Sequence, residues 1–180
     1  AMLRDVPAAE AMKSDVDEMD GMIDGYLDFA RGAAGERAVD TDVNALLEDA
    51  VGDAQRLGGV VAFTARGDLH GRVRPLSLKR CLGNLLGNAQ RYAETCALTA
   101  RRSGDVIEII VDDDGPGIPE DEREAAFRPF YRLENSRNQG TGGVGLGLAI
   151  TRDTLRNQGG DVTLDTAPQG GLRAIIHLPA

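Results

Sequence analysis

Between Met12 and Ala30, apolar side chains are spaced alternately four and three residues apart. That spacing is typical of a helix with a single apolar seam, formed here by Met12, Val16, Met19, Ile23, Tyr26 and Ala30. Such a seam packs either on a second helix, which a symmetric homodimer would supply, or on the chain's own domain; the pattern leaves both open. Residues 32–36 are rich in Gly and Ala and predict a linker. We therefore expect residues 1–35 to be a helical segment with its linker and residues 36–180 to be a separate domain.

From residue 36 onward, segments with helical spacing alternate with segments rich in apolar and β-branched residues, which predicts an α/β fold. Helices are expected from just after residues 40–42 through residue 57 and over residues 78–92, 119–126 and 148–155. Strands are expected over residues 60–65, 69–73, 95–102, 105–113, 161–166 and 172–178. Asp40, Thr41 and Asp42 offer capping oxygens to the first of these helices. The turn residues Gly67 and Asp68 predict that the first two strands form a hairpin.

The composition excludes several kinds of partner. The formal net charge of −9 argues against a general nucleic-acid surface, which needs clustered Lys and Arg, so any phosphate site must be local. Cys81 and Cys96 have no metal-ligand spacing and lie in apolar segments, which predicts reduced, buried thiols of a cytoplasmic protein. Two histidines are too few for a His-rich metal site, and no apolar run approaches the length of a membrane span.

Carboxylates and glycines follow directly on the apolar strand segment Glu108–Val111, where residues 112–117 are Asp-Asp-Asp-Gly-Pro-Gly. A carboxylate fixed at a strand end can accept a hydrogen bond from an exocyclic amine, and glycine lets the backbone pass close to a ligand. An ordinary turn has the same composition. The order of the chain favours a ligand site, because an Asn-rich helix precedes this run and a second glycine run follows it.

Asn84 and Asn88 are four residues apart, so their carboxamides project from one face of the predicted helix, with Arg91 and Tyr92 one turn further on. Asparagine is a poor helix former, and two on one face need a reason. The pair is either exposed to solvent, or bridges to a loop, or faces a ligand and its metal.

Glycine recurs at residues 143, 145 and 147, directly before the helix that runs to Leu155. A glycine-rich helix start presents unpaired backbone N–H groups, which suit a polyphosphate. Residues 134–143 have almost no apolar side chain and are expected to form a flexible flap. Phe127, Phe130 and Tyr131 precede this flap and suggest an anchor for it.

These elements, in this order, resemble the catalytic ATP-binding domain of sensor histidine kinases, within the gyrase-like ATPase superfamily. The resemblance runs from about Asp42 to the end of the chain and includes four ordered motifs: residues 84–92 resemble the N box, 113–117 the first glycine box, 127–130 the F box and 143–148 the second glycine box. The sequences around Tyr92 and Pro129 are particularly similar to the osmosensing branch. Residues 1–35 resemble the second helix of a dimerisation and phosphotransfer hairpin.

The resemblance implies a two-layer α/β sandwich with a mixed sheet and helices on one face. It also implies that Asp113 accepts the adenine amine, that Asn88 binds Mg²⁺ with Asn84 beside it, and that residues 132–142 form an ATP lid. Asn84 and Asn88 would be the catalytic pair. The implied nucleotide-binding residues are Asn88, Arg91, Tyr92, Asp113, Gly115, Gly117, Ile118, Phe130, Gly143, Gly145, Leu146, Gly147 and Leu148.

The implied activity is transfer of the ATP γ-phosphoryl group to a histidine, and from there to a response regulator. The partners would be ATP or ADP, the response regulator and a second copy of the chain. The domain would be the cytoplasmic part of an inner-membrane-anchored bacterial sensor. Val144 replaces the usual Thr or Ser, and neither His70 nor His177 lies in a predicted helix, so the phosphoacceptor is expected outside this chain.

Two other functions remain open. A gyrase-like ATP hydrolase carries a Glu general base at the place of Asn84, and a carboxamide cannot take a proton from water. A catalytically inactive ATP-binding scaffold would keep the fold, and Val144 gives that reading some support.

Overall fold

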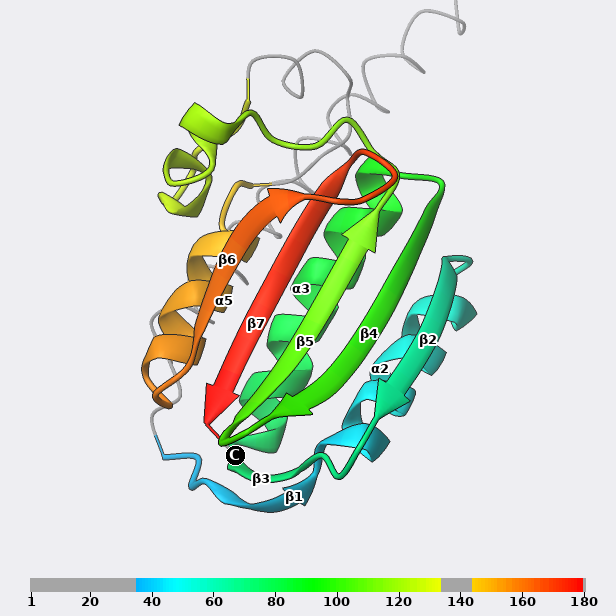
Figure 1. Ribbon diagram of the computed structural model, residues 1–180. Coiled ribbons are helices and arrows are strands. Elements are labelled where there is room, and N and C mark those ends of the chain that lie inside the picture. The colour runs from blue at the N-terminus through cyan, green and yellow to red at the C-terminus, as the bar shows by residue number, and fades with distance from the viewer. Residues whose placement is uncertain (1–34, 134–143, 180) are drawn as a thin grey trace, which may run out of the picture.

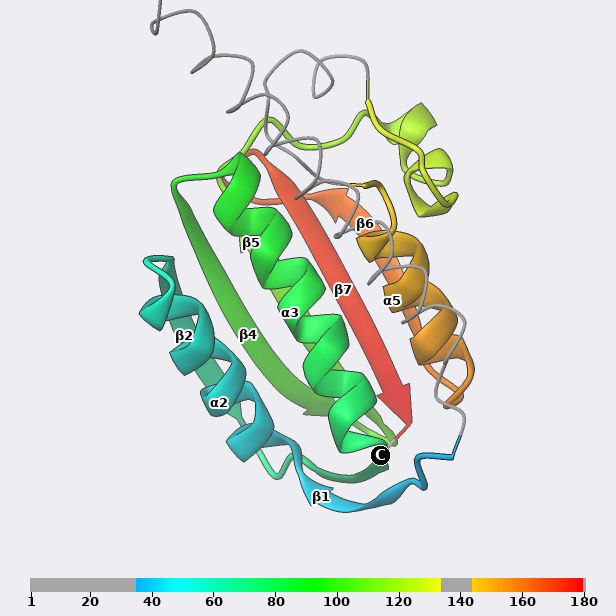
Figure 2. The same cartoon turned by 180° about the vertical axis from the view of Figure 1, so that it is seen from behind.

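The computed structural model describes residues 35–133 and 144–179. The expected N-terminal helix, the expected flap at 134–143 and Gly143 lie outside these residues. The main sheet has five strands in the order β2-β4-β5-β7-β6, and helices α2, α3 and α5 all cover one face of it (Figures 1 and 2). The described part of the chain is thus the expected two-layer sandwich.

Figure 1 labels the α-helices and β-strands of the domain. In chain order, the elements are β1 (Val39–Asp42), α2 (Val43–Arg56), β2 (Val60–Arg66), β3 (His70–Val73), α3 (Pro75–Tyr92), β4 (Thr95–Ser103), β5 (Val106–Asp113), the short 3-10 helices η1 (Glu120–Glu122) and η2 (Ala125–Phe127), α5 (Gly147–Arg156), β6 (Asp161–Thr166) and β7 (Leu172–Pro179). The single helix expected over residues 119–126 is therefore two 3-10 turns.

The hairpin expected of the first two predicted strands is wrong. β2 pairs in parallel with β4, whereas β3 pairs antiparallel with β1 in a separate two-stranded sheet. The reason lies in the residue between them: Leu69 is only 2% exposed, and its carbonyl accepts the backbone N–H of Val43 at the start of α2. Burial of Leu69 therefore directs the chain away from β2 after the turn.

The helix starts differ in how they are capped. Asp42 caps α2 as expected, because its carboxylate accepts the Asn44 N–H at 3.0 Å. α3 begins with Pro75 and has no capping side chain of its own at the preceding residue. The Glu36 carboxylate supplies the acceptors instead, taking the N–H groups of Leu76 at 2.7 Å and Ser77 at 2.9 Å.

The core lies between the sheet and the helices. Its largest fully buried side chains are Leu47, Leu78, Leu82, Leu86, Leu98, Ile107, Ile109, Leu155, Ile176 and Leu178. Cys81 and Cys96 are buried and free, as expected. Burial raises the pKa of the Cys81 thiol to about 12, and burial together with Asp113 and Asp114 raises that of Cys96 to about 11.

Both histidines lie in strands, as expected. His70 begins β3 and His177 lies in β7. Among the described residues, no helix is long and apolar enough to cross a membrane.

Candidate functional site

Three parts of the chain meet at the upper end of the sheet in Figure 1: the last turns of α3, the end of β5 and the start of α5. The Asn84 amide donates to the carbonyl of Gly147 at 3.3 Å, which joins α3 to α5. A Cβ on Gly115 would lie 2.7 Å from the carbonyl oxygen of Tyr92, so the end of β5 touches the end of α3. The three motifs that the sequence suggested are thus assembled at one place.

Asp113 lies at the centre of this assembly and is 7% exposed. Its Oδ1 accepts the N–H groups of Gly115 at 2.9 Å and Leu172 at 3.0 Å. Among the described residues, Oδ2 takes part in no hydrogen bond. The carboxylate is therefore held in one orientation and keeps one oxygen for a ligand.

The neighbouring carboxylates serve the fold. Asp112 forms a two-point ion pair with Arg173, both N–O distances being 2.7 Å, and this contact raises the pKa of the guanidinium. Asp114 accepts the Thr95 hydroxyl at 2.7 Å and the Thr95 N–H at 2.9 Å, contacts that lower its pKa. Of the aspartates at 112–114, only Asp113 offers an uncommitted oxygen at the site.

Gly171 brings a second loop against Asp113. Its φ is +82°, and a Cβ there would lie 2.1 Å from the Asp113 carbonyl oxygen. Gly117 faces the same loop, since its Cβ would be 3.0 Å from the Gly171 carbonyl. Gly117 is thus required by the packing of two backbones, a reason that the sequence did not suggest. The side chain of Ile118 packs against the core.

On α3, the two asparagines differ in their contacts. The Asn84 amide donates to Gly147 and, at 3.4 Å, to the hydroxyl of the fully buried Thr151, so it bridges the two helices. Asn88, one turn later, is half-buried and takes part in no hydrogen bond among the described residues. Arg91 is exposed and Tyr92 half-buried. Asn88 and Arg91 are thus the polar side chains of this helix end that remain available to a ligand.

The start of α5 is shaped by Gly145, whose φ is +73°. A Cβ there would lie 2.7 Å from the Tyr131 carbonyl oxygen, and the Gly145 carbonyl accepts the Phe130 N–H at 2.9 Å. Phe130 itself has a φ of 64° and is 59% exposed. Leu146, the residue before α5, has no capping side chain, and among the described residues no other side chain accepts from the first turn, so its N–H groups are open to an anion.

Leu146 and Leu148, beside these glycines, turn their side chains inward. Leu146 is 6% exposed, and Leu148 packs against the core. A ligand at the start of α5 would therefore meet chiefly their backbone groups. Val144 is half-buried.

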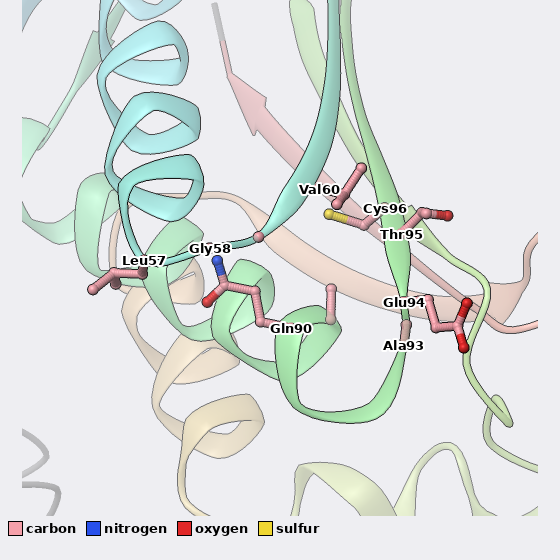
Figure 3. Close-up of a pocket in the computed structure, with 10 residues that line it drawn as sticks. Leu57, Gly58, Val60, Gln90, Ala93, Glu94, Thr95 and Cys96 are labelled. Atoms are coloured by element: carbon pink, nitrogen blue, oxygen red, sulfur yellow. The ribbon is translucent and has the colours of Figure 1, made fainter.

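A hollow lies beside the α3–β4 connection, between the end of α2 and the start of β2 (Figure 3). Its volume is about 220 Å³, and its walls are Leu57–Val60, Ala89, Gln90 and Ala93–Cys96. None of the expected nucleotide residues lines it. The described residues also contain no group of three or more His, Cys, Asp or Glu side chains that could hold a metal ion.

Comparison with known proteins identifies the family of the chain. Residues 73–180 match the family of histidine kinase-, DNA gyrase B- and HSP90-like ATPases. The chain belongs to this family.

Within this family, its relatives are sensor histidine kinases. The chain is 36% identical to the sensor histidine kinase GtrS of Pseudomonas aeruginosa over 99% of its own length and 33% identical to the sensor histidine kinase CpxA of Escherichia coli over 94%. It spans 37% and 39% of the lengths of these two relatives. The crystal structure of the ATP binding domain of PrrB from Mycobacterium tuberculosis is similar with a TM-score of 0.68 and 29% identity, over 80% of this chain and 98% of that one. The fold and the relatives define the chain as an ATP-binding catalytic domain of the sensor-kinase type.

Sequence reasoning missed three residues of the site: Gly171 and Leu172, which hold Asp113, and Thr151, which accepts from Asn84. Tyr131 was predicted only as an anchor of the flap, not as a contact of Gly145. Gly171 and Leu172 were interpreted only as parts of a turn and a strand. No local signal in the sequence relates them to Asp113, because the contact joins residues 59 positions apart.

Proposed function

We propose that this chain binds ATP at the α3, β5 and α5 site and transfers its γ-phosphoryl group to a histidine carried by another segment of a sensor kinase. The observation that carries the proposal is Asp113, whose Oδ1 is fixed by two backbone N–H groups while Oδ2 stays available. A buried acceptor of this kind suits the exocyclic amine of adenine. The Gly115 backbone and Tyr92 border the same space, so a flat base would lie against them.

The phosphates would extend from the base toward α5. The uncapped first turn of α5 offers backbone N–H groups, and the helix dipole favours negative charge there. Arg91 is exposed at the facing end of α3 and can reach toward a phosphate. Binding along this line would hold the γ-phosphoryl group at the mouth of the site, where an acceptor can approach.

Asn88 fits the role of magnesium ligand. Its half-buried carboxamide has no other hydrogen bond among the described residues, and Mg²⁺ is commonly held by one or two protein oxygens together with phosphates and water. When bound, the ion would neutralise charge that develops on the phosphate oxygens.

The phosphoacceptor should come from outside residues 35–179. His70 lies in β3, at the opposite end of the main sheet from the tip of β5 in Figure 1, and its Nδ1 is 2.8 Å from Asp68 Oδ1. His177 lies in β7, 3.7 Å from Glu108. Neither is placed to attack a phosphate at the start of α5.

The partners follow from the same proposal. The curated relatives are sensor histidine kinases, so a response regulator is the expected final acceptor. We assign residues 1–35 to the second helix of a dimerisation hairpin, through which two copies would associate. The whole protein would be anchored in the inner membrane with this domain in the cytoplasm.

Hydrolysis of ATP by this site should be slow. Asn84 occupies the place where a hydrolase of the gyrase type has its general base, and its amide is engaged by Gly147 and Thr151. A carboxamide cannot accept the proton of an attacking water.

Incubation with γ-labelled ATP tests the proposal. The chain alone should take up no label, and addition of a histidine-bearing hairpin in trans should give label that is labile to acid and stable to base. Asn88→Ala should abolish transfer, while Asn157→Ala, the same substitution at the exposed far end of α5, should not. Acid-labile label on the chain alone would overturn the assignment of the acceptor, and failure of transfer with intact nucleotide binding would favour a scaffold.

A further inference from the structure

We propose that Arg152 is a positioning residue, which clamps the segment 124–131, comprising η2 and the residues on either side of it, onto α5 and thereby sets the shape of the phosphate-binding end of the site. This inference rests on the proposed function and concerns how that site is held. Arg152 lies in α5, five residues after Gly147, so it is about 7.5 Å along the helix from the proposed phosphate site. It is therefore too far along the helix to be part of the first turn.

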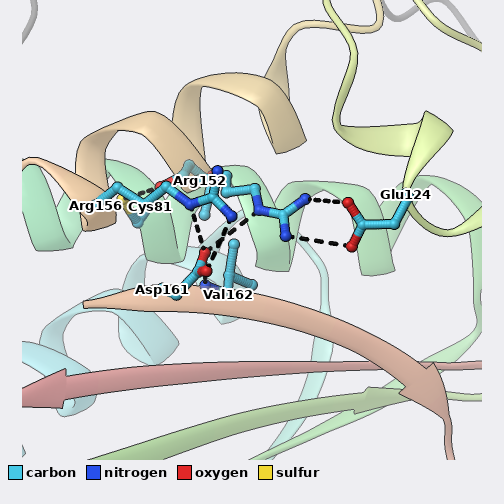
Figure 4. A network of polar contacts seen from close by, with 7 residues as sticks. Cys81, Glu124, Arg152, Arg156, Asp161 and Val162 are labelled. Carbon is cyan, nitrogen blue, oxygen red and sulfur yellow. Dashed lines mark hydrogen bonds and ion pairs between the residues drawn. The ribbon is translucent and has the colours of Figure 1, made fainter.

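Arg152 makes polar contacts with Glu124 and Asp161 (Figure 4), and its guanidinium also lies over the Phe127 ring. Two guanidinium nitrogens donate to the Glu124 carboxylate at 2.8 and 3.2 Å, and a third donates to Asp161 at 3.4 Å. The guanidinium carbon lies 4.1 Å from the centre of the Phe127 ring. Glu124 directly precedes η2 and Phe127 is its last residue, so a single side chain of α5 holds that turn by charge and by stacking.

The same segment continues into the turn that shapes the start of α5. Three residues after Phe127, the Phe130 N–H donates to the Gly145 carbonyl, and Tyr131 lies against the Cα of Gly145. Segment 124–131 is thus attached at two places, to α5 at Arg152 and to the turn before α5 at Gly145. Loosening the first attachment frees the segment to shift at the second, where the backbone conformation decides how the first N–H groups of α5 point.

A contribution to folding stability does not by itself explain the contacts between Arg152 and Glu124. The Glu124 side chain is 80% exposed, and solvent-exposed ion pairs contribute little to stability. Arg152, by contrast, is only 15% exposed and is held by three partners, Glu124, Phe127 and Asp161. Such a bidentate, stacked guanidinium defines geometry more than it adds free energy.

Separate affinities for two ligands test the inference. Adenosine occupies only the base end near Asp113, whereas a non-hydrolysable ATP analogue also needs the start of α5. Arg152→Gln should weaken binding of the analogue by about 3- to 30-fold and leave adenosine binding unchanged. Glu124→Gln should act in the same direction, and Arg152→Lys should restore part of the loss because it keeps the charge but not the bidentate geometry.

Arg156→Gln is the matched control, since Arg156 pairs with Asp161 from the same helix and should leave both affinities unchanged. If Arg152→Gln does not fold, as judged by circular dichroism, Glu124→Gln carries the same test. If Arg152→Gln weakens the binding of adenosine and of the ATP analogue equally, or changes neither affinity, the positioning role is overturned. Failure of the parent chain to bind the ATP analogue would instead overturn the proposed function.

Discussion

The substitution Asp113→Asn exchanges one carboxylate oxygen for nitrogen without changing the shape of the side chain. The N–H groups of Gly115 and Leu172 lie 2.9 and 3.0 Å from Oδ1. Only oxygen can accept from them, so the amide oxygen must take that position and the NH₂ group must take the position of Oδ2. The variant should therefore fold, and it should turn a donor toward the ligand where the parent offers an acceptor.

The loss can be estimated from the hydrogen bond that disappears. A hydrogen bond to a charged group contributes about 1.5–3 kcal/mol, and each 1.4 kcal/mol is about a factor of ten. The Kd for ADP should thus rise about 10- to 150-fold. The base of IDP has a carbonyl oxygen in place of the adenine amine, to which the new NH₂ group can donate. The preference of the parent for ADP over IDP should therefore disappear or reverse.

Calorimetric titration of the parent and of Asp113→Asn with ADP and with IDP gives the ratio of the two Kd values for each protein. Asp114→Asn is the matched control, because it removes the same charge one residue further on. Asp114 binds the start of β4 through Thr95 rather than facing the site, so its loss should leave the ratio unchanged. An unaltered affinity of Asp113→Asn for ADP, with the fold intact, would refute the reasoning and remove Asp113 from the base pocket.

Three further predictions concern the scaffold. Gly171→Ala should lower the free energy of unfolding in urea by about 1–3 kcal/mol more than Gly170→Ala. Both glycines have a positive φ, +82° at Gly171 and +87° at Gly170, but only a Cβ at 171 would meet Asp113. Equal losses of stability in the two variants would contradict this. Glu36→Gln should destabilise at pH 7 by about 0.5–2 kcal/mol. Burial raises the pKa of Glu36, but hydrogen bonds from Ser77 and Leu76 outweigh it, so the net pKa lies below 4.5. The stabilisation by Glu36 is therefore complete above pH 4.5 and is lost as the pH falls through its folded-state pKa. The urea unfolding curves of the parent and of Glu36→Gln should thus converge in acid. The control Glu120→Gln should have the stability of the parent at every pH. Cys81 and Cys96 should resist an aromatic disulfide reagent at neutral pH while the chain is folded, since their pKa values are raised to about 12 and about 11; fast labelling of the native chain would count against this.

The sequence could predict those parts of the site that depend on local pattern. The i, i+4 spacing of Asn84 and Asn88 puts both on one face of α3, and the strand that ends in Asp113 is visible in its apolar residues. A glycine run before a helical pattern likewise predicts the open start of α5. Each of these signals is contained within a few consecutive residues, so it can be recognised without knowledge of the tertiary structure.

Contacts between distant residues could not be predicted in this way. Leu172 fixes Asp113 across 59 positions, and Glu36 caps α3 across 41. The hairpin prediction failed for the same reason: the turn at Gly67 is real, with a φ of +86°, but burial of Leu69 and pairing with β4 decide which strands meet. For Asn84 the sequence left three readings open, and the structure places it in a bridge to Gly147 while it still faces the site.

Binding of ATP at the α3, β5 and α5 site is tested most directly by one titration of the 180-residue chain, followed by calorimetry, with a non-hydrolysable ATP analogue in the presence and absence of Mg²⁺. We predict saturable binding of one nucleotide per chain, tighter with Mg²⁺ than without it, and loss of the Mg²⁺ effect in Asn88→Ala. Absence of saturable heat at millimolar analogue, from a chain that is folded by circular dichroism, would contradict it.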